Sequence, residues 1–232
     1  MTQSILIPRR FRGPEASANG GYTCGTIAEL VDADIVEVTL RKPPPLDVEM
    51  AVERDGDAVR VLHEGELVAE ARPGSLDLEA PAAPDYAEAR AFSDARGDDP
   101  DHPFPGCFVC GPHGDGLRLR PAPLGDGRVV APWLVAPDLA GARFAWAALD
   151  CPGGWAVQPD ASRGISVLGR LTAAVYSAPK AGDECVVVGW PLGAPEGRKR
   201  HAGTALFLDG TLLALGRAVW FTMDDTVRDP AL

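Results

Sequence analysis

The order of the elements expected along this chain repeats, and this repeat constrains the fold more than any other feature. Segment 20–31 is rich in small residues and predicts a helix that begins after Asn19. An antiparallel meander is expected next, because alternating apolar residues and turn signals define short strands at 35–40, 48–53, 58–62 and 66–71. A second helix start lies within 146–157, and strand-like segments follow it at 165–176, 184–190, 201–208 and 212–221.

Short sequence matches accompany this repeated order. Gly-Gly-Tyr at 20–22 matches Gly-Gly-Trp at 153–155, and the proline-containing segment 43–47 matches 179–183. A helix with a face of small residues can lie close to a sheet that wraps around it. We therefore predict an α+β fold in which two antiparallel sheets each wrap around a long central helix. A ligand site is expected where the two units meet.

A change in composition separates the two units. We assign residues 1–80 to a first unit and 106–225 to a second unit. Between them, 81–105 is rich in Pro, Ala and Asp and is expected to be a linker, with a short helix near 86–92. Within the second unit, 117–120 is expected to form a strand.

Charge and cysteine content exclude several classes of function. The net charge of −11 argues against a nucleic-acid partner, because such partners require a basic surface. No segment is long and apolar enough to cross a bilayer, and the first ten residues hold no signal-peptide core, so no membrane partner is expected. The five cysteines, an odd number, favour free thiols and a cytoplasmic location.

Asp150 is the first candidate catalytic residue. An apolar run reaches Asp150, and Pro152, Gly153 and Gly154 follow it where a helix can begin. The carboxylate can act as a general base for water or as a nucleophile toward a carbonyl carbon. The N–H groups of the two glycines can then stabilise the oxyanion. Alternatively, Asp150 only complements the helix N-terminus.

Asn19 is the second candidate catalytic residue. It precedes Gly20 and Gly21 at the start of the first helix, where these glycines are candidates for holding a substrate oxygen. The amide of Asn19 can hold a carbonyl oxygen or a water molecule. Alternatively, Asn19 serves only as the N-cap of the helix, and the sequence favours this role.

Cys107 and Cys110 have the Cys-x-x-Cys spacing of half a zinc site, which His102 and His113 could complete. A second cysteine pair does not follow, so the sequence favours a reduced turn that packs near the pocket, without a metal. Cys151 could be a nucleophile, but no histidine lies near it in the sequence, and a small buried residue is the favoured interpretation.

These residues resemble the hotdog-fold acyl-CoA thioesterases, in the tandem double-hotdog arrangement. The similarity is carried by Asn-Gly-Gly-Tyr at 19–22, where many single-domain members have His-Gly-Gly, and by Asp150 before the second helix. Segments 107–112 and 116–119 also resemble a Cys-x-x-Cys-Gly lead-in found in some of these enzymes.

The resemblance implies hydrolysis of an acyl-CoA or related thioester, with water activated near Asp150 and the carbonyl held at a helix N-terminus. It implies no cofactor, and further pairing into a homodimer is common in this fold. The double-hotdog enzymes also use a Gln late in the second meander, and the corresponding segment 218–221 contains none. A non-catalytic acyl-CoA or fatty-acyl binding protein is therefore the main alternative, and a structural protein with a filled core is a third.

Arg198, Lys199 and Arg200 form the densest basic run in this acidic chain. Coenzyme A carries phosphates, which arginine and lysine side chains bind through charge-assisted hydrogen bonds. These three residues are candidate phosphate ligands, and a solvated hairpin end is the alternative.

Overall fold

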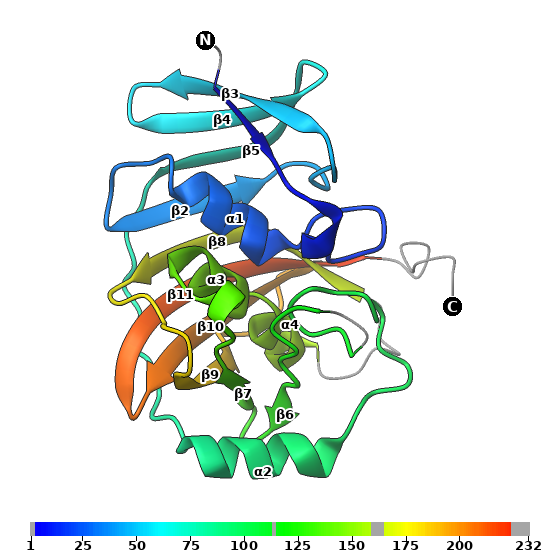
Figure 1. The fold of residues 1–232 in the computed structure, drawn as a ribbon, viewed down its shortest axis with the longest axis vertical. Coiled ribbons are helices and arrows are strands. Elements are labelled where there is room, and N and C mark those ends of the chain that lie inside the picture. The colour runs from blue at the N-terminus through cyan, green and yellow to red at the C-terminus, as the bar shows by residue number, and fades with distance from the viewer. Residues whose placement is uncertain (1–2, 113–114, 159–164, 224–232) are drawn as a thin grey trace.

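A single antiparallel sheet runs through the whole protein (Figure 1). The computed structural model describes residues 3–112, 115–158 and 165–223. In sheet order, the strands of the described residues are β1 (Gln3–Leu6), β3 (Glu49–Asp55), β4 (Ala58–His63), β5 (Glu66–Pro73), β2 (Ile35–Leu40), β8 (Ile165–Val175), β11 (Thr211–Met223), β10 (Lys199–Leu208), β9 (Glu184–Pro191), β7 (Val129–Leu134) and β6 (Ala122–Pro123).

The predicted meanders of both units are present, and their sheets join edge to edge. Strand β2 of the first unit pairs antiparallel with β8 of the second, with Ile35 opposite Ala174 and Thr39 opposite Arg170. The Arg170 guanidinium also donates a hydrogen bond to the Thr39 hydroxyl at 3.0 Å. The α+β fold class is confirmed, and the two expected sheets form one continuous surface.

Two hairpins turn at an acidic residue followed by glycine. Glu64 and Gly65 have φ values of 51° and 80°, and Asp209 and Gly210 have values of 48° and 75°. Two successive residues with positive φ form the turn whose twist matches that of paired strands, and an acidic residue followed by Gly tolerates this geometry. The turns set which residues of the adjoining strands face the core.

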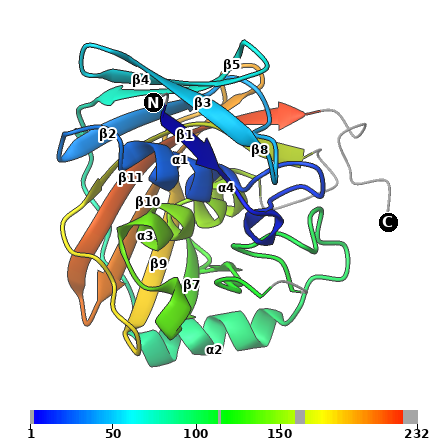
Figure 2. The same ribbon diagram turned by 45° about the horizontal axis from the view of Figure 1, so that its top comes forward.

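Three helices lie on the concave side of the sheet, α1 (Gly20–Ala28), α3 (Ala142–Ala148) and α4 (Cys151–Val157) (Figure 2). The small residues of α1 permit its close contact with α3. A Cβ atom on Gly21 would lie 2.5 Å from the Asp150 Cβ, and one on Gly25 would lie 2.8 Å from the Trp146 Cβ. Short 3-10 helices occur at Arg9–Phe11 and Pro137–Leu139.

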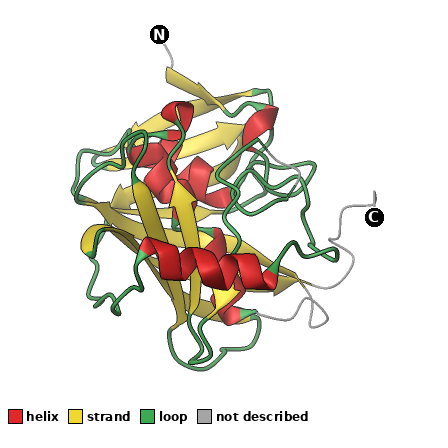
Figure 3. Cartoon of the chain, turned by 60° about the horizontal axis from the view of Figure 1, so that its bottom comes forward, coloured by secondary structure: helices red, strands yellow, loops and turns green. Residues whose placement is uncertain are grey.

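The segment between the two units covers the outer face of the sheet in the second unit. It contains helix α2 (Tyr86–Arg96), which lies across the strands (Figure 3). The Asp85 carboxylate caps the N-terminus of this helix. Ala89 on α2 is fully buried in a cluster with sheet residues that include Val188 and Phe207. The helix expected near 86–92 is therefore present and extends to Arg96.

Two local predictions were wrong. Residues 117–120 do not form a strand, because the N–H groups of Leu117 and Leu119 bond to the carbonyls of Phe108 and Val109 in the preceding turn. The second central helix is not a single long helix. It is divided into α3 and α4, with Asp150 between them. Among the described helices, none has the length and apolar character needed to span a membrane.

Candidate active site

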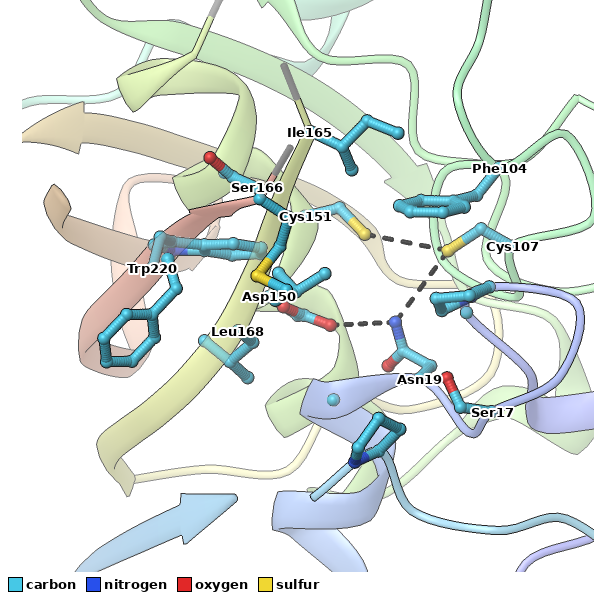
Figure 4. A pocket seen from close by; sticks show the side chains of 18 of the residues that line it. Ser17, Asn19, Phe104, Cys107, Asp150, Cys151, Ile165, Ser166, Leu168 and Trp220 are labelled. Atoms are coloured by element: carbon cyan, nitrogen blue, oxygen red, sulfur yellow. Dashed lines mark hydrogen bonds between the residues drawn. The ribbon is translucent and has the colours of Figure 1, made fainter. Parts of the chain in front are cut away.

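Asp150 lies at the junction of α3 and α4, and its side chain turns toward the first unit. It occupies the N-cap position of α4 but makes no cap hydrogen bond there. Its Oδ2 atom instead accepts hydrogen bonds from the Gly21 N–H at 2.9 Å and from Asn19 Nδ2 at 2.8 Å (Figure 4). The Oδ1 atom is buried and has no hydrogen-bond partner among the described residues. One carboxylate oxygen is thus held by two donors, and the other is buried without such a partner among the described residues, in a side chain that lines a cavity.

Asn19 is the N-cap that the sequence favoured, and its amide also contacts Asp150. Its Oδ1 accepts the Tyr22 N–H at 2.9 Å and caps α1. Its Nδ2 points the other way, to Asp150 and to the Cys107 sulfur 3.8 Å away. The capping bond fixes the amide so that its N–H₂ side must face Asp150.

Burial raises the pKa of Asp150 to about 7, because desolvation disfavours the charged carboxylate. Hydrogen bonds from the Gly21 N–H and the Asn19 amide oppose this change, and the nearby Cys107 adds to it. The side chain is only 2% exposed. Perturbed carboxyl groups of this kind are typical of sites that transfer protons.

Three cysteine side chains meet beside Asp150. The Sγ atoms of Cys107, Cys110 and Cys151 lie within 4.8 Å of one another, and all three residues are buried. Hydrogen bonds from the thiols of Cys110 and Cys151 hold the pKa of Cys107 well below its usual value, assisted by the backbone N–H groups of Cys110 and Val109. The pKa values of Cys110 and Cys151 are raised, first by their hydrogen bonds to Cys107. Each of the five cysteines of the chain is a free thiol.

A cavity of about 760 Å³ connects these groups, and both units line it. Asn19, Cys107, Asp150 and Cys151 face the cavity together with apolar side chains that include Leu168 and Trp220 (Figure 4). A largely apolar cavity with a few converging polar groups is typical of a small-molecule site. The site lies where the two units meet, as the repeated element order indicated.

The glycines that were predicted to hold an oxyanion occupy different environments. Gly20 and Gly154 line the cavity. The Gly21 N–H binds Asp150 directly. The N–H of Gly153 bonds to the Asp150 carbonyl at 3.0 Å, and this residue lies outside the cavity lining. Sequence reasoning did not identify Gly21 as a ligand of Asp150, because the contact joins two separate helix starts.

Of the basic run, Arg198 alone lines the cavity. Lys199 begins β10, and the Arg200 guanidinium donates to the carbonyls of Gly197 and Lys199. Two cations that the sequence did not single out, Arg41 and Lys42, also line the cavity, and they pair with Glu70 and Glu66 respectively.

His102 lies in the cavity lining near the cysteines. Its Nδ1 accepts the Phe104 N–H at 3.0 Å, and its buried Nε2 has no partner within the described parts of the chain. Burial lowers the pKa of His102, so the neutral ring is favoured. His113, the other histidine considered beside the cysteines, lies outside the described residues.

Comparison with known proteins places the chain by structure alone. Neither a family profile nor a curated protein sequence matches it. A putative thioesterase from Novosphingobium aromaticivorans superposes with a TM-score of 0.62 at 17% identity, covering 95% of this chain and 94% of that one. A hotdog-fold protein from Alicyclobacillus acidocaldarius gives 0.62 at 14% identity, covering 95% and 92%. An acyl-CoA thioesterase II from Mycobacterium marinum gives 0.57 at 13% identity, also covering 95% and 92%.

These identities are too low to transfer an activity, but the shared structure extends over both units and the segment between them. The chain therefore has the tandem hotdog fold found in these thioesterase structures.

Proposed function

We propose that this protein hydrolyses an acyl thioester. The observation that carries the proposal is the arrangement of Asp150, which is buried at an apolar cavity with Oδ2 held by Gly21 and Asn19 and with Oδ1 unpartnered among the described residues. An acyl chain fits an apolar lining, and a buried carboxylate that is held from one side can act on water from the other.

In the proposed reaction, Asp150 Oδ1 removes a proton from a water molecule as the water oxygen attacks the thioester carbonyl carbon. The carbonyl oxygen becomes an oxyanion, and the first-turn N–H of Gly20 supports it, since Gly20 lines the cavity and the first N–H groups of a helix have no partner within the helix. Collapse of the intermediate breaks the carbon–sulfur bond. The leaving thiolate takes the proton from Asp150, giving a carboxylic acid and a thiol.

Coenzyme A is the proposed carrier of the acyl group. Arg198 lines the same cavity as Asp150 and offers a guanidinium for a phosphate group. One of the solved structures with this fold is an acyl-CoA thioesterase II, and this likeness also supports coenzyme A as the carrier. Lys199 and Arg200 are not assigned to the carrier, since neither lines the cavity.

The experiment measures release of free coenzyme A from a panel of acyl-CoA thioesters by chromatography. We expect turnover by the wild-type protein and a fall in kcat of at least about 100-fold in Asp150→Asn, with little change in KM. Asparagine retains an oxygen that can accept from Gly21 and Asn19 but cannot accept a proton from water at neutral pH.

A non-catalytic acyl-CoA binding protein is the second candidate. The residue that favours it is Trp220 of β11, which faces the cavity. Segment 218–221, which contains Trp220, has no Gln, the residue that the resemblance implied there for catalysis. A wild-type protein that binds acyl-CoA by calorimetry and never releases free coenzyme A would establish this function and reject hydrolysis.

A further inference from the structure

We propose that Cys107, Cys110 and Cys151 bind one thiophilic metal ion, with Zn²⁺ as the expected occupant, at the wall of the cavity. The Sγ atoms of these three residues lie within 4.8 Å of one another, and those of Cys107 and Cys151 are 3.8 Å apart. Two thiolates bound about 2.3 Å from a tetrahedral zinc ion are separated by about 3.8 Å. The cluster therefore needs only a small contraction to bind the ion.

The turn that carries Cys107 and Cys110 is built for this geometry. The Gly111 N–H closes the turn by donating to the Cys107 carbonyl at 2.8 Å. A Cβ atom on Gly111 would lie 2.5 Å from the Cys107 nitrogen, so the backbone can pass here only at glycine. The Asn19 side-chain amide donates to the Cys107 sulfur at 3.8 Å. A donor of this kind stabilises a thiolate, which is the form that binds a metal.

The turn is also held in place from outside. The N–H groups of Leu117 and Leu119 donate to the carbonyls of Phe108 and Val109, at 2.9 and 2.8 Å. This pairing occupies the residues that were expected to form a strand. Two of the three sulfurs thus sit on a preorganised loop, and the third comes from Cys151, the first residue of α4.

A divalent cation would offset the negative charge of thiolates in this buried cluster. Burial and, after it, the negative charges of Asp183 and Asp209 raise the pKa of Cys185, a thiol outside the cluster, to about 12. A bound divalent ion deprotonates the thiols that coordinate it and offsets two of their three negative charges.

The fourth coordination position faces the cavity, since all three cysteines line it. His102 does not occupy that position in the arrangement described, because its Nδ1 accepts the Phe104 N–H and the neutral ring then carries its proton on Nε2. The position is thus open to water or to a small ligand. This metal site does not depend on the proposed hydrolysis. Metal binding can therefore be measured without an activity assay.

Tag-free protein, purified with a reductant and stripped with a chelator, is titrated with Co²⁺. We expect one Co²⁺ per chain, a thiolate-to-cobalt charge-transfer band, and displacement of that band by Zn²⁺. Substitution of Cys110 or Cys151 by serine should weaken binding by at least about tenfold and reduce the band. Cys185→Ser is the matched control, since Cys185 is buried in β9 outside the cluster, and it should bind as the wild type does.

A second measurement uses only the wild-type protein and does not depend on folded variants. Cysteine alkylation in the native state, mapped by mass spectrometry, should show Zn²⁺ protecting Cys107, Cys110 and Cys151 and leaving the reactivity of Cys24 and Cys185 unchanged. Absence of the charge-transfer band, together with no selective protection, would overturn the proposal. Recovery of a Cys107–Cys151 disulfide from freshly reduced protein that takes up no metal would also overturn it.

Discussion

The amide of Asn19 donates a hydrogen bond to the Asp150 carboxylate at 2.8 Å, across 131 positions of the sequence. Asn19 begins α1 of the first unit, and Asp150 precedes α4 of the second. The helix starts of both units must therefore be in place before the candidate active site exists. The bond makes the proposed catalysis depend on the contact between the two halves.

Asn19→Asp is expected to remove activity while keeping the helix cap. A carboxylate at this position can still accept the Tyr22 N–H, but it places a negative charge beside Asp150 and cannot donate to it. We expect kcat to fall by at least about 100-fold. Asn19→Ala should lower kcat too, and it should also cost about 1–2 kcal/mol of unfolding free energy because the cap is lost. Steady-state kinetics and urea unfolding measure the two effects.

The control for lost capping is Asp85→Ala in α2, where the Asp85 carboxylate accepts the Glu88 N–H far from the cavity. This variant should lose stability and retain its kcat. An Asn19→Asp variant with wild-type kcat would contradict the role assigned to the Asn19 amide.

Gly21→Ala is expected to destabilise the protein by about 3 kcal/mol through overpacking. Its new Cβ would lie 2.5 Å from the Asp150 Cβ and 2.8 Å from the Trp146 carbonyl oxygen, both of which are held by the helix contact. Urea unfolding gives the free energy. Gly20→Ala is the comparison, because its Cβ would lie 2.9 Å from the Leu168 Cδ2, which can rotate away, and 3.0 Å from the Leu168 Cβ, so a small shift of β8 relieves the contact. Equal costs for the two variants would show that α1 does not press closely on the α3–α4 junction.

Arg198→Glu is expected to raise KM for acyl-CoA by about tenfold and to leave kcat nearly unchanged, because the lost charge binds the carrier rather than the reacting carbonyl. The same variant should hydrolyse an acyl N-acetylcysteamine thioester, which has no phosphates, as well as the wild type does. Arg200→Glu is the matched control, since the Arg200 side chain bonds to backbone carbonyls and does not line the cavity. Equal effects of both variants on KM would contradict a contact between Arg198 and the carrier, and would indicate a long-range electrostatic effect of the charge change.

The two units are expected to unfold together, because β2 pairs with β8 and α1 packs against α3. All five tryptophans lie in the second unit, so their fluorescence reports on that unit alone. Met50→Ala removes a fully buried side chain from β3 in the first unit and should cost about 2–5 kcal/mol. We expect the urea midpoint measured by tryptophan fluorescence to fall as far as the midpoint measured by circular dichroism. An unchanged fluorescence midpoint would mean that the units unfold separately.

Much of the local structure could be read from the residues themselves. Strand β2 begins and ends where the alternation of apolar residues at 35–40 predicts it. The hairpins at Glu64–Gly65 and Asp209–Gly210 follow from the backbone conformations that these dipeptides tolerate. The small residues of 20–28 indicated a closely packed helix, and Gly21 and Gly25 meet α3 and Asp150 as such a helix requires. Each of these features is decided by neighbours along the chain.

The tertiary structure alone decided the joining of the sheets through β2 and β8, the bonds from Asn19 and Gly21 to Asp150, and the meeting of Cys151 with Cys107. Residues 117–120 carried a strand-like pattern, yet their N–H groups pair with the cysteine turn. The physical reason is the same in each case. A local pattern limits the conformation of its own segment, whereas the partner of a polar group or a strand edge is fixed only when distant segments pack together.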